Sequence, residues 1–436
     1  MRTVPAFILM TLIICTASSV RAEDKCLGCH EQKTRGIVNY WKESRHAKEQ
    51  VVCVSCHGGD VEANHNRSVV VTSTKCGECH KKALTDHSMS KHGIGLKSGR
   101  GCTRKLEISP EQKKTCTFCH DEGSAQPRIN TECAMFLAQS PQMQRQGCNA
   151  CHRVEDRCDT CHSKHGTDTS LARMPETCGT CHMGPDHAQL EMWESSPHGV
   201  LYRRAGEAAG PSCATCHMKG GSHNVSTGIT AGIPETSMPL KKQERALMLD
   251  TCASCHTRSM AGKNLEDADM LEKQSTALLA EARSIVQQLQ TEKLLSPTAD
   301  ERPPHPLFGK NFVIGPHMLY ENLSTVESLY FRMKQFYYMN AVKGAFHQNP
   351  DYTHWYGNAP LKLTLSEIRS EASLLRNIDL IARRLDNISS ACTSTDAAAD
   401  GFKKKLRNLH EMKLKGEISE KDFQELKNSL MKEKGL

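Results

Sequence analysis

Cysteine and histidine are the residues whose types and spacing could do chemistry in this chain of 436 residues, which contains 22 of each. Eighteen of the cysteines fall in nine copies of Cys-x-x-Cys-His, the attachment signature of c-type haem. The two thiols bond to the vinyl groups on one porphyrin edge, and the following histidine lies under the iron as proximal ligand. The nine copies are Cys26, Cys29 and His30; Cys53, Cys56 and His57; Cys76, Cys79 and His80; Cys116, Cys119 and His120; Cys148, Cys151 and His152; Cys158, Cys161 and His162; Cys178, Cys181 and His182; Cys213, Cys216 and His217; and Cys252, Cys255 and His256.

The spacing of these cysteines excludes the other common uses of Cys-x-x-Cys. Disulfide scaffolds, zinc ribbons and redox-active cysteine pairs do not require a histidine after every pair. The motifs crowd into residues 26–256, and aromatic residues are only 5% of the chain. We therefore expect haems stacked in a chain to fill the interior. The net charge of +7 would then offset haem propionates, so no nucleic-acid partner is expected.

Thirteen histidines lie outside the motifs and could supply the second axial ligand of the irons. A haem that only carries electrons usually has two axial ligands, whereas a catalytic haem keeps one position open. The count allows eight closed haems and one open one, or nine closed ones, so it does not separate an enzyme from an electron conduit. We set His410 aside because it lies in a charged tail. The predicted distal ligands are His46, His92, His165, His198 and His223; the other candidates are His65, His87, His187, His305, His317, His347 and His354.

Short segments around and beyond the motifs carry a resemblance to a known family. They are Ser44-Arg45-His46-Ala47, the run from Cys178 to His187, Glu191-Met192-Trp193, Ser196-Pro197-His198-Gly199, Cys213-Ala-Thr-Cys-His-Met and the run from His347 to Gly357. Their order and spacing resemble the octahaem hydroxylamine oxidoreductase (HAO) family from about residue 24 to about residue 390. The resemblance implies a mostly helical chain, a line of haems, a homotrimer and one catalytic haem with an open distal face.

The catalytic haem of that family is the fourth of eight, whereas this chain has nine motifs. Counting back from the well-matched Cys178 motif places the catalytic haem on the Cys148 motif and makes the Cys116 motif the surplus one. The alternative is that the Cys116 motif is catalytic. The resemblance also implies that Asp186 and His187 are the distal catalytic pair, an acid and an imidazole that could deliver or remove protons.

The direction of the reaction is less determined by the residues. Some family members link the catalytic haem to a tyrosine of a neighbouring subunit and oxidise hydroxylamine or hydrazine, and members without the link lean toward reduction. Tyr352 and Tyr356 lie near the relevant segment, but packing against a haem or at a subunit interface is the alternative role for both. No motif ends in lysine, which disfavours a pentahaem-type nitrite reductase. We favour reduction of nitrite or hydroxylamine to ammonium; the alternatives are hydroxylamine oxidation and a non-catalytic electron-transfer cytochrome.

The haem-free remainder must supply the helices that cover this stack. Apolar residues at helical intervals predict helices over 265–295, 319–342 and 361–385, with a loop at 298–316. Small polar residues at 393–400 predict a linker, and two charged helices follow from Phe402, separated by Gly416 and Ser419. This pair resembles the short C-terminal helical-pair (SHOCT-like) module of bacterial proteins and would serve assembly or tethering.

The N-terminus predicts export. Arg2, an apolar run from Val4 to Ala17 and Val20-Arg21-Ala22 form the pattern of a cleaved secretory signal peptide, which implies a periplasmic protein. We expect its partners to be a small inorganic nitrogen substrate and a redox partner, either a cytochrome or a quinol-oxidising protein. The predicted fold class is mostly α, with a signal peptide (1–22), a multihaem domain (23–260), a helical domain (261–390), a linker (391–401) and the helical pair (402–436).

Overall fold

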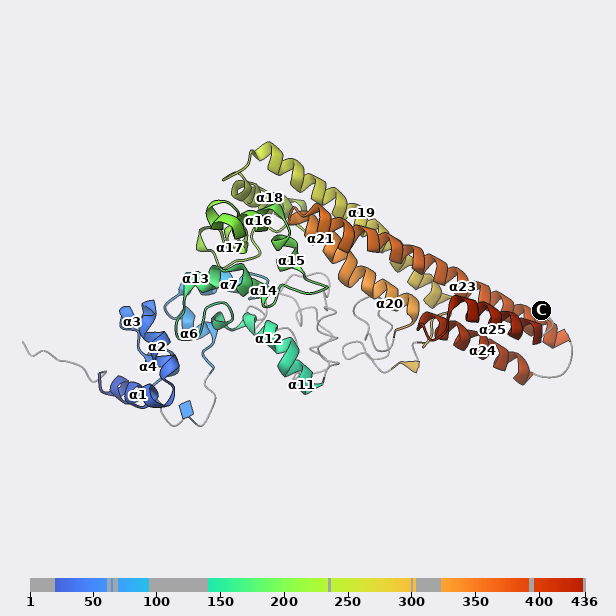
Figure 1. Cartoon of the computed structure of the whole chain (residues 1–436), viewed down its shortest axis with the longest axis horizontal. Coiled ribbons are helices and arrows are strands. Elements are labelled where there is room, and N and C mark those ends of the chain that lie inside the picture. The colour runs from blue at the N-terminus through green and yellow to red at the C-terminus, as the bar shows by residue number, and fades with distance from the viewer. Residues whose placement is uncertain are drawn as a thin grey trace, which may run out of the picture.

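The computed structural model describes residues 20–60, 64–65, 70–93, 140–233, 237–298, 301–302, 323–391 and 396–433. Within these ranges the secondary structure is helical and contains no strand, which agrees with the predicted class. Figure 1 shows two regions that differ in the length of their helices. Short helices and turns make up the N-terminal region, whereas long helices run from there to the C-terminal end of the molecule.

The first region contains all the described haem-attachment motifs. Several motifs form single helical turns, such as α4 (Cys53–His57) and α17 (Cys213–His217), so that the two thiols project from the same turn. Its other helices are α1 (Val20–Lys33), α2 (Arg35–Glu43), α3 (Arg45–Lys48), α6 (Ser73–Gly77), α7 (Lys81–Ser88), α11 (Pro141–Met143), η2 (Gln144–Cys148), α12 (Asn149–His152), η3 (Arg153–Glu155), η4 (Cys158–Thr160), α13 (Thr169–Arg173), α14 (Pro175–Gly179), α15 (Gln189–Glu194), α16 (Pro197–Ala205), η5 (Gly206–Ala208), η6 (Lys219–Gly221) and α18 (Met238–Cys252).

Apolar side chains form almost no core in this first region. The buried hydrophobic residues described between 20 and 257 are Val38, Ala188, Met192, Trp193 and Ala214. Polar caps hold the short helices instead. Ser44, Asp168, Ser196 and Ser212 each accept a backbone N–H at a helix start. Capping by itself does not create a folded interior, so this region needs another source of buried contact.

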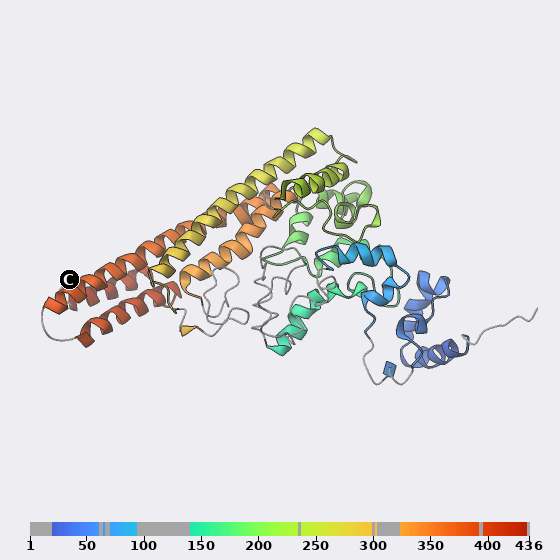
Figure 2. The same ribbon diagram turned by 180° about the vertical axis from the view of Figure 1, so that it is seen from behind.

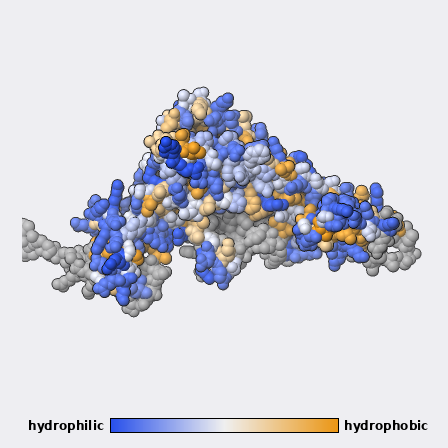
Figure 3. Space-filling model, in the orientation of Figure 1, coloured by the Kyte–Doolittle hydropathy of each residue, from blue (hydrophilic) through white to orange (hydrophobic). Residues whose placement is uncertain are grey.

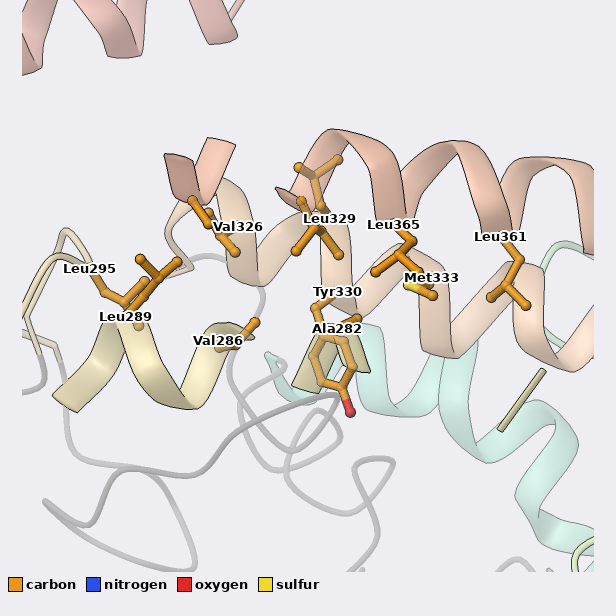
Figure 4. Close-up of a cluster of buried hydrophobic side chains, with 12 residues drawn as sticks. Ala282, Val286, Leu289, Leu295, Val326, Leu329, Tyr330, Met333, Leu361 and Leu365 are labelled. Carbon is orange, nitrogen blue, oxygen red and sulfur yellow. The ribbon is translucent and has the colours of Figure 1, made fainter. Parts of the chain in front are cut away.

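The second region is built on long helices with an apolar core. Its elements are α19 (Arg258–Thr291), α20 (Thr325–Arg332), η10 (Met333–Tyr338), α21 (Met339–Phe346), α22 (Pro350–Tyr352), η11 (Thr353–Asn358) and α23 (Ala359–Ala391). The elements α20, η10 and α21 follow one another without a break, and α19 and α23 pack against them. Figure 4 shows Val286, Leu289, Val326, Met333 and Leu365 meeting between these helices. Burial of each large side chain of this kind contributes about 1.5–3 kcal/mol.

Helix starts differ from the predicted ones where a cap or a good helix former intervenes. The second predicted helix begins at Thr325, not at 319, because Ser324 and Glu327 form a capping box there. Helical structure also begins before 361, at Pro350, where the Asn349 side chain accepts the Tyr352 N–H. The predicted loop at 298–316 lies mostly outside the described residues, and so does most of the predicted signal peptide.

The C-terminal helices α24 (Asp396–Leu414) and α25 (Glu420–Glu433) pack beside α23, as Figure 2 shows from behind. The predicted linker at 391–401 is wrong in its second half, because helix α24 already begins at Asp396 in an alanine-rich stretch. Gly416, with φ of 72°, and Ser419, which accepts the Asp422 N–H, separate the two helices as predicted. Phe402 and Leu406 pack against Ile378 of α23.

His410 is not part of a solvated tail as its charged neighbours suggested. Its side chain is buried, and its ring hydrogen-bonds to both carboxylate oxygens of buried Glu371 on α23, at 3.0 and 3.1 Å. None of the described helices combines the length and the apolar character needed to cross a bilayer. The face in Figure 3 is largely hydrophilic, with apolar patches, some of them over the C-terminal helices.

Candidate haem sites and a candidate proton-transfer pair

Histidine rings meet in pairs throughout the first region. Every motif histidine whose ring the structure describes faces one histidine from outside the motifs. The pairs, motif histidine first and with the distance between ring centres, are His30–His65 (5.9 Å), His57–His165 (6.1 Å), His80–His46 (6.0 Å), His162–His223 (6.1 Å), His182–His92 (5.8 Å), His217–His347 (6.4 Å) and His256–His198 (5.9 Å).

This recurring separation fits an iron between two imidazoles. Two metal–nitrogen bonds of about 2 Å each, with the distance from each nitrogen to its ring centre, account for about 6 Å. Direct contact between stacked rings would be closer, as in the Tyr352–Tyr356 pair at 4.6 Å. In the described part of the chain, no three His, Cys, Asp or Glu side chains converge as they would around a bare metal ion. The donor set therefore fits haem with two axial histidines.

The structure places all five predicted distal histidines opposite a motif histidine. Sequence reasoning left His65 and His347 in the wider candidate set without selecting them. His65 lies 35 residues beyond His30, and His347 lies 130 residues beyond His217 in the sequence. No fixed spacing relates a distal histidine to its motif, so the sequence contains no local signal for either one. His347 also shows that the haem-free second region supplies a residue to a haem site.

Hydrogen bonds fix the orientation of several of these rings. The Nδ1–H of His347 donates to the Lys343 carbonyl at 2.7 Å, which leaves Nε2 to face His217. The Nδ1 atoms of His30 and His46 lie 2.7 and 3.2 Å from the hydroxyls of Thr34 and Thr167. Partners of this kind select the tautomer and ring orientation of a metal-binding histidine.

Burial lowers the pKa of several of the paired rings and so favours their neutral form, which is the form that binds iron. Burial, and then the neighbouring His182, lower the pKa of His92 to about 4. Burial, and then His347, lower the pKa of His217 to about 4. The imidazoles of His92 and His217 therefore do not need to lose a proton when they bind a metal near neutral pH.

The two cysteines of a motif differ in how far they are covered by the chain. The first cysteine is partly buried in each of the seven motifs with a facing histidine, whereas the second is exposed in five of them and partly buried in two. This difference fits a porphyrin that lies along the outer side of each turn. The exposed second cysteines are Cys29, Cys56, Cys79, Cys161 and Cys255, and the partly buried ones are Cys181 and Cys216.

Attachment cysteines of different motifs lie beside one another. The Cys76 thiol lies beside that of Cys158, and the Cys178 thiol beside that of Cys213. Cys161 lies close to Cys178, and Cys216 lies close to Cys252.

A partly buried guanidinium group also fits a haem. Arg245 donates through Nη2 to both oxygens of Asp269, at 2.7 and 2.8 Å, and to the Thr230 hydroxyl at 3.0 Å. Its other terminal nitrogen, Nη1, is buried and has no hydrogen-bond partner among the described residues. Arg245 lies near Cys252 and 6.0 Å from the centre of the Phe346 ring. A haem propionate is the acceptor expected at such a place.

Two motifs, those of the predicted catalytic haem and its alternative, are described little or not at all. The predicted attachment residues Cys116 and Cys119 and the predicted proximal ligand His120 all lie outside the described residues. The side chains of Cys148 and His152 lie outside them as well. Attachment and ligation at these five positions therefore stay predictions.

The backbone of the Cys148 motif and one of its thiols are nevertheless in place. Residues 149–152 form helix α12, which η3 follows directly, and Cys151 is partly buried. The His87 Nε2 atom lies 3.0 Å from the carbonyl of Val154 in η3. His87 therefore hydrogen-bonds to the backbone just after this motif. Its ring faces none of the described motif histidines.

Asp186 and His187 form a hydrogen-bonded pair in the loop between α14 and α15. The His187 Nδ1–H donates to Asp186 Oδ1, and Asp186 Oδ2 accepts from Gln335 Nε2 at 3.3 Å. Burial alone would raise the pKa of Asp186, but the hydrogen bond and charge of His187 and the bond from Gln335 hold it below its usual value. Asp186 is therefore an ionised acceptor, and Nε2 of the partly exposed His187 remains available.

The pair lies beside a haem ligand without facing it as a ligand would. The His187 ring is 6.4 Å from that of His182 and nearly perpendicular to it, at 82°. The ring of His182 already faces His92 at 5.8 Å. Among the described histidines, His187 therefore has the position of a side chain next to a haem site and not that of the distal ligand of His182.

Three side chains hold the loop that carries this pair. Lys343 Nζ donates to the Asp186 carbonyl at 3.2 Å. Glu191 Oε1 accepts from the Gly184 N–H at 2.9 Å, where Gly184 has a φ of 95° that favours glycine. Gln335 binds the carboxylate itself. Sequence reasoning missed Gln335 and Lys343, because nothing in their own neighbourhood marks them as partners of a residue about 150 positions earlier.

Tyr352 and Tyr356 stack on each other next to these elements. Burial, and then the charge of Glu191, raise the pKa of Tyr352. Tyr356 and the adjacent Trp355 are largely exposed, at 57% and 65%. The geometry thus gives two tyrosines with different environments, one facing Glu191 and one facing outward.

Comparison with known proteins agrees with this arrangement. The family model described as "Seven times multi-haem cytochrome CxxCH" matches residues 49–303, and that described as "Cytochrome c554 and c-prime" matches residues 8–58. The "Probable nitrite reductase-hydroxylamine oxidoreductase fusion protein" of Kuenenia stuttgartiensis is 26% identical over 81% of this chain and 52% of its own length. "Multiheme cytochrome MtrA" of Shewanella baltica (strain OS185) is 26% identical over 49% of this chain and 61% of its own.

Solved structures show the same fold. The Kuenenia stuttgartiensis "reducing HAO-like protein complex" contains a chain with a TM-score of 0.66 and 24% identity, covering 84% of this chain and 87% of that one. A "Hypothetical multiheme protein" has a TM-score of 0.57 and 17% identity, covering 84% of this chain and 100% of that one. This chain spans between half and two thirds of the length of the two curated relatives. The motifs, the facing histidines and a family model that covers more than half of the residues together show that the chain belongs to the multihaem cytochrome c family.

Proposed function

We propose that the protein is a periplasmic multihaem oxidoreductase that reduces a small nitrogen compound, nitrite or hydroxylamine, to ammonium. In this proposal a cytochrome or a quinol-oxidising protein supplies electrons, and haems on the nine motifs carry them to one haem with an open distal side. That haem is attached to the Cys148 motif, or alternatively to the Cys116 motif. A homotrimer is part of the same proposal, since the family resemblance implies it.

The observation that carries the proposal is the Asp186–His187 pair. An ordinary electron-transfer site needs two axial ligands, and His182 already faces His92. A second imidazole, held by an ionised carboxylate beside this site, has no role in closing that haem. It does have the form of a general acid and base, because a carboxylate that accepts from Nδ1 leaves Nε2 to exchange protons. The named relatives from Kuenenia stuttgartiensis point toward nitrogen chemistry as well.

The roles of the groups follow from the chemistry of reduction. An open haem would supply a binding site for the substrate and the electrons for its reduction. Each cleaved nitrogen–oxygen bond needs protons to release water, and further protons build the ammonium. His187 would deliver a proton from Nε2 and recover one from solvent through its exposed edge. Asp186 would stabilise the protonated imidazole, and Gln335 and Lys343 would hold both in place.

A pure electron conduit is the second candidate function. It is favoured by one observation, namely that all seven described motif histidines face a distal histidine. The similarity to a multihaem cytochrome named MtrA points the same way. The two candidates differ in whether any iron remains open, and in whether the Asp186–His187 pair affects turnover.

The test uses the purified holoprotein with His187→Ala and, as matched control, His354→Ala, an exposed histidine that faces none of the described motif histidines. Both variants should keep every haem, since attachment depends on the cysteines. Nitrite or hydroxylamine should still bind to His187→Ala, but turnover should fall about 10²-fold or more, whereas His354→Ala should match the parent. Normal turnover in His187→Ala, or no turnover in any form with complete haem loading, would contradict the proposal.

A further inference from the structure

Helix α21 contacts two parts of the haem region at once. Three residues beyond its C-terminal end, the buried Asn349 side chain donates to the Met192 carbonyl and to the Ser195 hydroxyl, both at 2.8 Å. One turn and a half earlier, the Lys343 ammonium donates to the Asp186 carbonyl at 3.2 Å. Helix α21 and the residue that caps α22 therefore hold α15 and the loop before it in place.

Lys343 is the residue of this helix that reaches both a haem ligand and the proton-transfer pair. Its carbonyl accepts the backbone N–H of His347 at 2.9 Å and also the ring Nδ1–H at 2.7 Å. Its ammonium lies at the Asp186 carbonyl, next to His187, whose ring is 6.4 Å from that of His182. The same residue thus contacts His347 through its carbonyl and lies near His182 through its ammonium. These two histidines belong to different haem sites, those of the Cys178 and Cys213 motifs, whose first thiols are in contact.

A positive charge in this position has a definite effect on iron. Reduction of a ferric haem to a ferrous haem lowers its charge by one, so a nearby cation favours the ferrous form. The interaction is strong where the charge is half-buried and water is partly excluded. The electron comes from a neighbouring haem of the chain, and Lys343 itself neither gains nor loses a proton in the step.

We propose that Lys343 is a positioning residue with two effects: its ammonium fixes the Asp186–His187 loop, and its charge raises the reduction potentials of the haems on the Cys178 and Cys213 motifs. Electrons would then collect next to the pair that supplies protons. The first effect rests on the function proposed above, whereas the second requires only that both haems are present. Gln335 does not share the second effect, because its amide carries no charge.

The experiment is a spectropotentiometric titration of the holoprotein without substrate. Lys343→Met should move two haem transitions to lower potential and leave the others in place, while Lys343→Arg should keep all transitions near their parental positions. Lys362→Met is the matched control, since Lys362 is an exposed lysine on the neighbouring helix α23, and it should shift nothing. If Lys343→Met folds poorly, Lys343→Gln replaces it, with haem content measured by intact mass.

Turnover of nitrite or hydroxylamine is measured on the same samples. Loss of the brace should lower kcat about tenfold, with a smaller change in KM and with recovery in Lys343→Arg. Unchanged potentials in fully loaded Lys343→Met would overturn the electrostatic effect. Unchanged kcat would overturn the positioning effect. If the parent shows no turnover, the proposed function fails while the potentials still decide the role of the charge.

Discussion

The two regions of this molecule differ in how many apolar side chains they bury. Residues 258–433 bury leucine, isoleucine, valine and methionine between helices of up to 34 residues. Residues 20–257 bury few apolar side chains and form short turns, yet they bring histidines together from distant positions at one repeated separation. We infer from this difference that bound haems stabilise the fold of the first region, whereas the apolar core of the second region stabilises its own fold.

The regions are nevertheless not independent. His347, Lys343 and Gln335 belong to the second region by their helices and act on the first by their contacts. The apolar core of the second region holds these three side chains in register, because Met333 and Leu365 fix the helices that carry them. Rigid support from a packed core is what a proton-transfer pair needs, since small displacements are costly for catalysis.

The two regions should differ most in stability when the full-length chain is made without haem attachment. The second region should still form its helices, because its core consists of side chains alone, while the first should remain unfolded. Hydrogen exchange read by mass spectrometry would show slow exchange within 258–391 and fast exchange within 20–257. Equal protection of both regions in the haem-free chain would break the comparison.

Two substitutions in the second region should separate stability from haem ligation. Leu365→Ala removes a fully packed side chain and should cost about 2–5 kcal/mol of unfolding free energy, with no change in the haem spectrum. His347→Ala should cost less stability but open the distal side of one haem, seen as a new high-spin signal at unchanged haem count. Denaturant titration and the optical spectrum of both variants give the answer. A spectral change in Leu365→Ala with none in His347→Ala would reverse the assignment.

A smaller effect is expected from acid. The pKa of Asp186 is held below its ordinary value of about 3.9. A carboxylate with a lowered folded pKa adds stability above its unfolded pKa, and this contribution is lost as the pH falls through the folded pKa. Turnover that depends on ionised Asp186 should therefore stay constant from neutral pH down to about pH 4. It should decrease at lower pH, where Asp186 becomes protonated. Asp186→Asn should remove this acid limb from the pH profile, and a limb that persists would assign it to another group.

The smallest effect on the haem region should come from the C-terminal pair. Glu371→Gln weakens the bond to buried His410 and should destabilise the docking of α24 by about 1–3 kcal/mol. Hydrogen exchange should rise in 396–433 and stay unchanged in 323–346, and the haem spectrum should not move. Arg383→Gln, a change in an exposed ion pair on the same helix, is the control. A change in haem potentials in Glu371→Gln would show that these helices matter to the haem sites.

The attachment residues could be predicted from the sequence, whereas several of the residues that lie near them in the folded chain could not. The motif spacing predicts attachment directly, because two thiols and an imidazole must meet one porphyrin within five residues. Facing histidines such as His65 and His347 have no such local rule, since only the folded chain brings them to the motif. The contact of Lys343 with the Asp186 carbonyl is even harder to predict from the sequence, because it depends on the placement of α21 against α15.

Helix prediction followed the same division. Apolar periodicity located α19 and α23, where side-chain packing determines the helix. Ends were missed where a cap decided them, as at Ser324, or where alanines extended a helix into a segment that read as a linker, as at Asp396. In the first region, apolar periodicity does not predict the helices, because they are expected to pack against a porphyrin and not against a neighbouring helix.

We propose that facing histidines close most haems and that one haem, on the Cys148 motif or alternatively on the Cys116 motif, keeps an open distal side. The most direct measurement is the low-temperature electron paramagnetic resonance spectrum of the oxidised holoprotein, quantified against its haem content. The account predicts low-spin signals from at least the seven haems with facing histidines, and a high-spin signal from one haem that changes when nitrite is added. A spectrum without any high-spin signal, or one in which high-spin haems predominate, would contradict it.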